Sequence, residues 1–166
     1  MNNKELKSLV SEAITACQEK KAEDITILEL EQGSGAFTDY FLLCTGTNPR
    51  QVEAIAEEVE VRLKRTFGEY AAHTEGYRQA EWILLDYVDF VVHVFSDKAR
   101  QFYDLERLWK SARRITPEEF AASSRKKTAV KTSAVKKAVV KKKAGKKAAT
   151  TKKVVLAKKT VRKKKA

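Results

Sequence analysis

Residues 40–49 read YFLLCTGTNP, and this stretch predicts how the chain passes from a strand into a helix. The apolar run 40–44 carries no charge and is too short for a helix, which is typical of a strand buried on both faces. The pair Gly46-Thr47 ends the strand. Asn48 can cap the following helix, and Pro49 at the first helical position loses nothing by lacking an N–H group. A buried strand that runs directly into a helix favours an α/β fold.

Hydrophobic periodicity predicts the elements on either side of this stretch. Helical spacing predicts helices over 4–19, 49–67 and 97–112, and short apolar runs predict strands over 24–30, 81–85 and 90–95. A short link with polar ends, residues 86–89, suits an antiparallel hairpin between the last two strands. This order of elements predicts a small α/β sandwich with a mixed sheet. The apolar stripes of the second and third helices are expected to include Phe67, Phe102, Leu105, Leu108 and Trp109.

Charge divides the 166-residue chain into two predicted segments. Residues 121–166 hold 19 of the 34 basic residues and no acidic residue, so residues 1–120 hold 15 basic against 22 acidic residues and carry a net charge of −7. We expect residues 1–120 to form one α/β domain. Residues 121–166 lack the large apolar side chains that offset the entropy of ordering, so we expect a disordered Lys/Ala-rich arm.

The arm is expected to contact nucleic acid without reading its sequence. Nineteen like charges attract a polyanion strongly, whereas no aromatic ring is present to stack on bases. The composition resembles the tails of linker histones, although such a run can also be a solubilising appendage. The candidate contact residues are Lys126, Lys127, Lys136, Lys137, Lys141, Lys142, Lys143, Lys146 and Lys147.

Signals for catalysis, cofactors or metals are few. The sequence contains no Gly-rich phosphate loop, nucleophile elbow or zinc-protease helix. Cys17 and Cys44 lack metal-ligand spacing and are expected to be reduced core thiols. Asp86 and Asp89 are the only close carboxylate pair near an apolar strand, but the same-face neighbour of Asp89 is Val91, so a two-metal site lacks its second ligand. We expect no enzyme, no cofactor and no metal site.

The histidines and the ends of the chain give further expectations. His93 lies in an apolar strand on the face opposite its neighbours Val92 and Val94, where a contact to a partner or to a covering side chain is a simpler interpretation than a catalytic base. No run reaches the roughly 18 to 20 apolar residues of a membrane span, and no signal peptide or Arg-rich presequence is recognisable. We therefore expect a soluble protein of the bacterial cytoplasm.

The segment 75–87, EGYRQAEWILLDY, is rich in residue types that anchor protein interfaces. Alternation sends Trp82 and Leu84 to one face of a strand and Ile83 and Leu85 to the other, so both faces are apolar. One face can pack on helices, and the other favours a dimer or a partner contact. The alternative is that the aromatic residues of the segment only complete the core.

Six runs in register resemble the ribosomal silencing factor family, also called RsfS or Iojap. The resemblance covers about residues 6–112, with one difference at Val88, where the family usually has glycine. A valine is not expected to adopt a positive φ, so the hairpin turn is expected to differ. The matching runs are DYF (39–41), TGTNPRQV (45–52), EGY (75–77), EWILLDY (81–87), DFVVHVF (89–95) and RQFYDLERLW (100–109).

This resemblance implies a nucleotidyltransferase-like fold that has lost catalysis. Family members bind the fourteenth protein of the large ribosomal subunit, block joining with the small subunit and lower translation when nutrients are scarce. They are often homodimers when free. A residual nucleotidyltransferase and a nucleic-acid-compacting protein that acts through the arm are the alternatives.

Carried over to this chain, the resemblance places Trp82 and Leu84 at the centre of the ribosomal contact. The surrounding residues would be Tyr77, Asp86, Tyr87 and His93, and the polar rim would be Glu75 and Arg78. We expect the later aromatic and apolar residues to pack in the fold first and to contact the partner second; these are Tyr103, Leu105 and Trp109.

Overall fold

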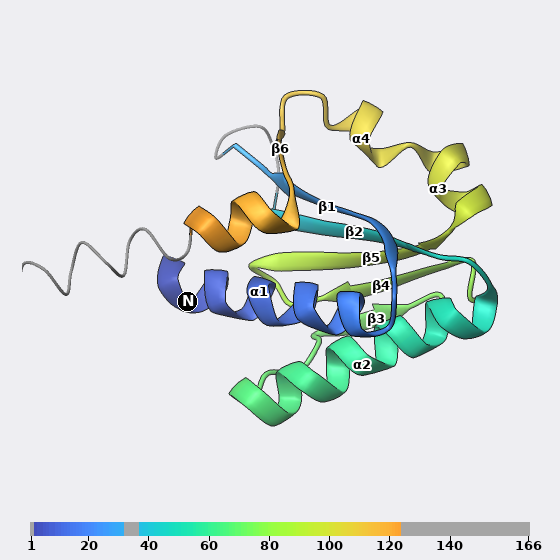
Figure 1. Ribbon diagram of the computed structural model, residues 1–166, viewed down its shortest axis with the longest axis horizontal. Helices are drawn as coiled ribbons and strands as arrows, with labels where there is room; N and C mark the ends of the chain where they lie inside the picture. Colours follow the sequence, from blue (N-terminus) through green and yellow to red (C-terminus); the bar gives the residue numbers. More distant parts are fainter. Residues whose placement is uncertain (1, 32–36, 124–166) are drawn as a thin grey trace, which may run out of the picture. The chain divides into compact units, whose positions relative to one another are not determined.

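The computed structural model describes residues 2–31 and 37–123, and the predicted arm lies outside these residues from position 124 onward. The chain builds a mixed α/β structure (Figure 1), as predicted. Its elements are α1 (Asn3–Glu19), β1 (Glu23–Glu29), β2 (Tyr40–Gly46), α2 (Pro49–Phe67), β3 (His73–Glu75), β4 (Trp82–Asp86), β5 (Phe90–Ser96), α3 (Asp97–Tyr103), α4 (Leu105–Leu108) and β6 (Arg113–Ile115).

One sheet organises the described residues, with six strands in the order β3-β4-β5-β2-β1-β6. Strands β2 and β5 are parallel, and the other neighbouring pairs are antiparallel. The sheet is therefore mixed, as expected. Every residue of β2 is buried, which confirms the prediction of a strand covered on both faces, because β2 lies in the middle of the sheet.

The predicted boundaries of α2 are confirmed, and local chemistry explains them. The Asn48 side chain accepts a hydrogen bond from the backbone N–H of Gln51 at 2.9 Å, and Pro49 occupies the first helical position. At the other end, Gly68 adopts φ 72°, a left-handed conformation that glycine reaches without steric cost. Both ends of α2 are thus fixed by residues whose roles are readable from the sequence.

Two apolar layers lie on opposite sides of the sheet. Helices α1 and α2 pack on one side, which holds the larger core (Figure 1). The other side holds a smaller cluster, against which Leu105, Trp109 and Ala112 are only partly buried. Helices α3 and α4 lie on this second side (Figure 1). The coverage of the two sides is therefore unequal.

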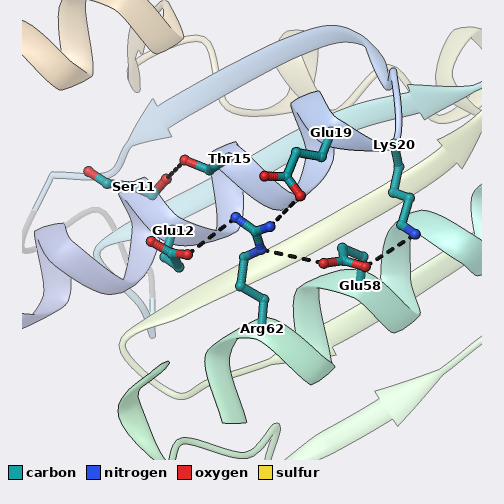
Figure 2. Close-up of polar contacts among 7 residues, drawn as sticks. All are labelled: Ser11, Glu12, Thr15, Glu19, Lys20, Glu58 and Arg62. Carbon is teal, nitrogen blue, oxygen red and sulfur yellow. Dashed lines mark hydrogen bonds and ion pairs between the residues drawn. The ribbon is translucent and has the colours of Figure 1, made fainter. Parts of the chain in front are cut away.

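An ion network joins α1 to α2 (Figure 2). The Arg62 guanidinium on α2 lies 3.3 Å from a carboxylate oxygen of Glu12 and also pairs with Glu19, both on α1. It contacts Glu58, one turn earlier on its own helix, at 3.4 Å. Lys20 reaches the same Glu58 carboxylate at 3.1 Å. These contacts lower the pKa of Glu58, with the hydrogen bond from Lys20 as the largest cause.

The prediction of one helix over 97–112 was wrong. Helix α3 ends at Tyr103, and Asp104 adopts φ 40° before the single turn of α4. Phe102 of α3 is 81% exposed and Leu108 of α4 is 69% exposed, whereas Leu105 and Trp109 pack against the smaller cluster. Phe67, expected in the apolar stripe of α2, is exposed as well. Helical spacing alone therefore did not predict which of these side chains are buried.

Two short edge strands and a last helical segment were not predicted. Strand β3 pairs with β4 after Gly76 turns the chain at φ 90°, and a Cβ atom at Gly76 would lie 1.8 Å from the carbonyl oxygen of Trp82. Strand β6 pairs with β1 at the opposite edge. Residues 117–123 form a helix that begins at Pro117 and is drawn in orange beside α1 (Figure 1). Its Phe120 is buried edge-on against Tyr40 at 5.6 Å.

The hairpin between β4 and β5 corrects the expectation for Val88. This residue does adopt a positive φ, 68°, which is an unfavourable conformation for a β-branched side chain. The backbone N–H of Val88 donates to Asp86 Oδ1 at 2.8 Å, and Tyr87 N–H donates to the Phe90 carbonyl at 3.0 Å. These hydrogen bonds keep the tight turn although glycine is absent.

Candidate partner-binding face

Strand register brings part of the anchor-rich segment onto the side of the sheet that α1 and α2 leave uncovered. Leu84 is paired with Glu75 on β3 and with His93 on β5, so these three side chains share one face. Two residues after Leu84 in β4, and on the same face, Asp86 is paired with His73 of β3. We call this surface the open face, and it comprises His73, Glu75, Trp82, Leu84 and Asp86.

Trp82 is the central side chain of the open face, and three neighbouring rings fix its position. Its ring stacks on Phe95 with centroids 5.0 Å apart and lies 4.7 Å from Tyr103 of α3. The indole Nε1 donates a hydrogen bond to Nδ1 of His93 at 3.2 Å. Trp82 and Leu84 remain only half-buried. A rigid, partly exposed tryptophan is a typical anchor of a protein interface.

His93 lies beneath this surface and does not reach it. Its side chain is only 5% exposed and meets the Phe41 ring edge-on at 5.0 Å. Burial lowers the pKa of His93 to about 4, and the nearby positive charge of Arg100 adds to this shift. The imidazole is therefore neutral near pH 7. The structure gives His93 a place in the layer that supports Trp82, and not on the outer surface.

Contacts of Arg100 hold α3 and α4 over one end of the open face. Its guanidinium pairs with Glu106, donates to Thr45 Oγ1 at 3.4 Å and donates to the Asp24 carbonyl at 3.3 Å. The same group lies 5.9 Å from the centre of the Phe95 ring. These contacts link α3 and α4 to β1 and β2, and thereby hold Tyr103 against the indole of the open face.

The structure does not bring all the candidate residues together, because Tyr77 and Tyr87 lie on the side covered by helices. The Tyr77 hydroxyl donates to Glu60 of α2 at 2.6 Å. Tyr87 is buried and stacks on Phe90 at 4.9 Å, and its hydroxyl has no partner among the described residues. Burial is the main cause that raises the pKa of both phenols. Continued by one residue past β4, the alternation that separates Leu84 from Leu85 places Tyr87 on the covered side, whereas Tyr77 lies outside the strand and has no such signal.

Both residues predicted to form a polar rim have exposed side chains. Glu75 is exposed on the edge strand β3, and Arg78 is exposed in the turn that follows it. Asp86 lies on the open face, where its carboxylate accepts the Val88 N–H. His73, which the sequence interpretation did not include, lies beside Asp86. His73 lies in an edge strand of three residues, which is too short to show a periodic pattern in the sequence.

Exposed apolar side chains around the open face were also missed. Phe102 and Leu108 project from α3 and α4, and Phe37 is exposed beside Phe41, with ring centroids 6.4 Å apart. Helical spacing had assigned the first two to the core. The local signal that could have shown the break between α3 and α4 is Asp104, because Asp is a preferred N-cap residue and its side chain caps α4.

Two features of the described residues bear on phosphate and metal binding. A Gly-Thr turn before a helix can hold a phosphate group, but at α2 the Thr47 N–H donates to Gln51 Oε1 at 2.8 Å and the Asn48 side chain caps the helix. Within residues 2–31 and 37–123, no group of three or more potential ligands could hold a metal ion. Cys17 and Cys44 are buried free thiols with sulfur atoms 3.8 Å apart, as core thiols were expected to be.

No helix in the described part of the chain has both the length and the apolar character needed to cross a membrane.

Comparisons with known proteins agree with this architecture. A family model described as "Ribosomal silencing factor during starvation" matches residues 3–152. The ribosomal silencing factor RsfS of Bacillus subtilis is 42% identical over 106 residues, covering 64% of this chain and 88% of that protein. A crystal structure of a Chromobacterium violaceum protein, 35% identical, superimposes with a TM-score of 0.59 and covers 62% of this chain and 84% of that one.

A more distant mouse protein is 26% identical over 99 residues, covering 58% of this chain and 42% of that protein. Its name is "Mitochondrial assembly of ribosomal large subunit protein 1".

Proposed function

The chain belongs to the ribosomal silencing factor family, and from this premise we propose that its open face binds the large ribosomal subunit and sterically blocks joining with the small subunit. The proposal carries over what the resemblance to the family implies. The name of the distant mouse relative, which refers to the large subunit, is in line with it.

The uncovered position of Trp82 is the observation that carries this proposal. Two helices bury one side of the sheet, whereas the indole and Leu84 on the other side are only half-buried. Large rings that are already held in place offer buried area at a low entropic cost, as interface hot spots do. We therefore assign Trp82 and Leu84 to the centre of the contact, with Glu75, Arg78 and Asp86 at its rim.

The proposed partner on the subunit is its fourteenth protein, as the family resemblance implies. Residues 1–120 carry a net charge of −7, which suits a basic ribosomal protein, because complementary potentials speed encounter and orient the two partners. Steric exclusion needs only affinity and correct placement, so no catalytic residue is assigned. Lowered translation under nutrient limitation is the physiological outcome that we propose, in the cytoplasm where ribosomes are found.

Two further contacts belong to this proposal. The basic arm would add sequence-independent contacts with ribosomal RNA, because its charges can neutralise phosphates. In the free protein, a second copy would cover the open face as a homodimer, since the exposed apolar side chains there favour a cover. A nucleic-acid-compacting role of the arm is the alternative, and strong binding of bulk DNA without binding of ribosomal subunits would support it.

Co-sedimentation with purified large subunits tests the proposed face. Trp82→Ala should weaken binding by at least about 2 kcal/mol if the indole is a hot spot. Phe67→Ala is a matched control, because Phe67 is an exposed aromatic residue at the end of α2 and lies outside the open face. Loss of binding in the first variant only is the expected result. Unchanged co-sedimentation of a folded Trp82→Ala protein would refute the assignment.

A further inference from the structure

The polar edge of Trp82 is held from within the sheet. Nε1 of the indole donates to Nδ1 of His93 at 3.2 Å. Because Nδ1 accepts this hydrogen bond, the neutral imidazole carries its proton on Nε2. Nε2 is buried and has no partner within the described residues. Nδ1 of His93 therefore accepts from Trp82, and the N–H at Nε2 has no acceptor within the described residues.

Core stability does not explain a histidine at this position. The imidazole lies among the rings of Phe41 and Phe95, at centroid distances of 5.0 and 6.0 Å. A buried N–H group without an acceptor destabilises a fold. A phenylalanine ring would occupy similar space without this penalty, and the feature that the imidazole has and phenylalanine lacks is the acceptor of the Trp82 hydrogen bond.

This hydrogen bond completes the restraint on the indole. Phe95 stacks on the ring and Tyr103 contacts it from α3, but apolar ring contacts carry no direction, and χ2 of a tryptophan has a broad, roughly two-fold preference. The hydrogen bond to His93 adds the directional contact that selects one orientation. Side chains that are ordered before binding save the entropy that ordering would otherwise cost on association.

We propose that His93 is a positioning residue for partner binding, which fixes the Trp82 indole in its binding orientation through the Nε1–Nδ1 hydrogen bond. The inference rests on the proposed function of the open face. Burial prevents His93 from contacting the partner directly, so its effect on binding would act through Trp82. The imidazole must be neutral to accept the bond, and burial together with the charge of Arg100, the charged group that faces it from α3, keeps it so near pH 7.

Variants of the full chain separate positioning from a merely structural role. His93→Phe keeps a ring and removes the acceptor, so the affinity for purified large subunits should fall roughly three- to tenfold, the effect of leaving one side chain unordered, while thermal stability stays unchanged or rises. His93→Asn retains an acceptor oxygen near the position of Nδ1 and should recover part of the affinity. In a Trp82→Phe background, which has no indole N–H, His93→Phe should cause no further loss.

The possible outcomes distinguish this inference from the proposed function. Equal losses from His93→Phe in both backgrounds, or no loss where Trp82→Ala does weaken binding, would overturn the positioning role alone. Unchanged binding by Trp82→Ala would overturn the proposed function itself. A measurement on the unmodified chain covers the case in which a variant does not fold: the indole N–H resonance of Trp82 should exchange slowly with solvent, and rapid exchange would overturn the inference.

Discussion

Tyr77 and Trp82 are close in sequence but lie on opposite sides of the sheet. The Tyr77 hydroxyl donates to Glu60 of α2 at 2.6 Å, whereas the Trp82 indole stacks on Phe95 and contacts Tyr103 of α3. The two aromatic residues are therefore separated by the sheet itself. Changes at these two positions should affect different properties of the protein.

Tyr77→Phe should lower stability without affecting partner binding. The change keeps the ring and removes a hydrogen bond to a carboxylate, so the free energy of unfolding should fall by about 1 kcal/mol, less than for a fully buried bond. Urea unfolding measures the loss, and co-sedimentation with large subunits should stay as in the unmodified chain. Weakened binding with unchanged stability would instead place Tyr77 in contact with the partner.

Val88→Gly should stabilise the protein. Val88 is 62% exposed and holds a φ of 68°, so glycine removes steric strain and loses little packing. Glycine also raises the conformational entropy of the unfolded chain, which offsets part of this benefit. The free energy of unfolding should therefore rise by about 1 kcal/mol.

The control for this change is Val61→Gly, because Val61 is similarly exposed but lies within α2. There the substitution should lower stability by roughly 0.5 kcal/mol, since glycine is a poorer helix former than valine. Destabilisation by both changes would show that the turn at Val88 is not strained.

Stability should fall between pH 6.5 and about pH 4 because of His93, whose pKa is lowered from 6.5 to about 4. Above pH 6.5 the imidazole is neutral in both the folded and the unfolded chain. Between the unfolded and the folded pKa the unfolded chain binds a proton that the folded chain does not, so acid favours unfolding. The free energy of unfolding should fall by on the order of 3 kcal/mol over this range.

Urea unfolding at a series of pH values measures this effect, with His93→Phe as the control. The variant should show a flatter dependence between pH 6.5 and 4.5. Below that range both proteins should lose stability, because Glu58 and Glu106 have lowered pKa values and contribute stability that is lost as they are protonated. Equal slopes for the two proteins above pH 4.5 would contradict the assignment to His93.

Removal of the arm should make ribosome binding less sensitive to salt. A chain that ends at Ala122 lacks 19 basic residues, and each lost phosphate contact reduces the slope of log affinity against log salt concentration. Affinities for large subunits across a salt series test this. Equal slopes for the full and shortened chains would show that the arm makes no phosphate contacts.

The parts of the fold that were predictable are those in which local chemistry decides the structure. Asn48, Pro49 and Gly68 fix the ends of α2 through capping and backbone preference, and the uncharged run in β2 requires burial on both faces. Each of these signals is contained within a few residues. Their outcome does not depend on distant parts of the chain.

The parts that were missed depend on tertiary contacts. Strand β3 exists because Gly76 lets the chain approach the Trp82 carbonyl, and the break at Asp104 is held by Arg100, whose partners include Thr45 and Asp24. Neither contact has a local signature. For the same reason, the anchor-rich composition of 75–87 indicated an interface but could not tell which of its aromatic residues share a face.

The most direct test of the account is the joining of purified large and small subunits, followed by light scattering with the chain in saturating excess. The unmodified chain should prevent the rise in scattering that marks complete ribosomes, and Trp82→Ala should restore it at the same concentration. Joining at the same rate and to the same extent with and without the unmodified chain would contradict the central claim that the open face occupies the site needed by the small subunit.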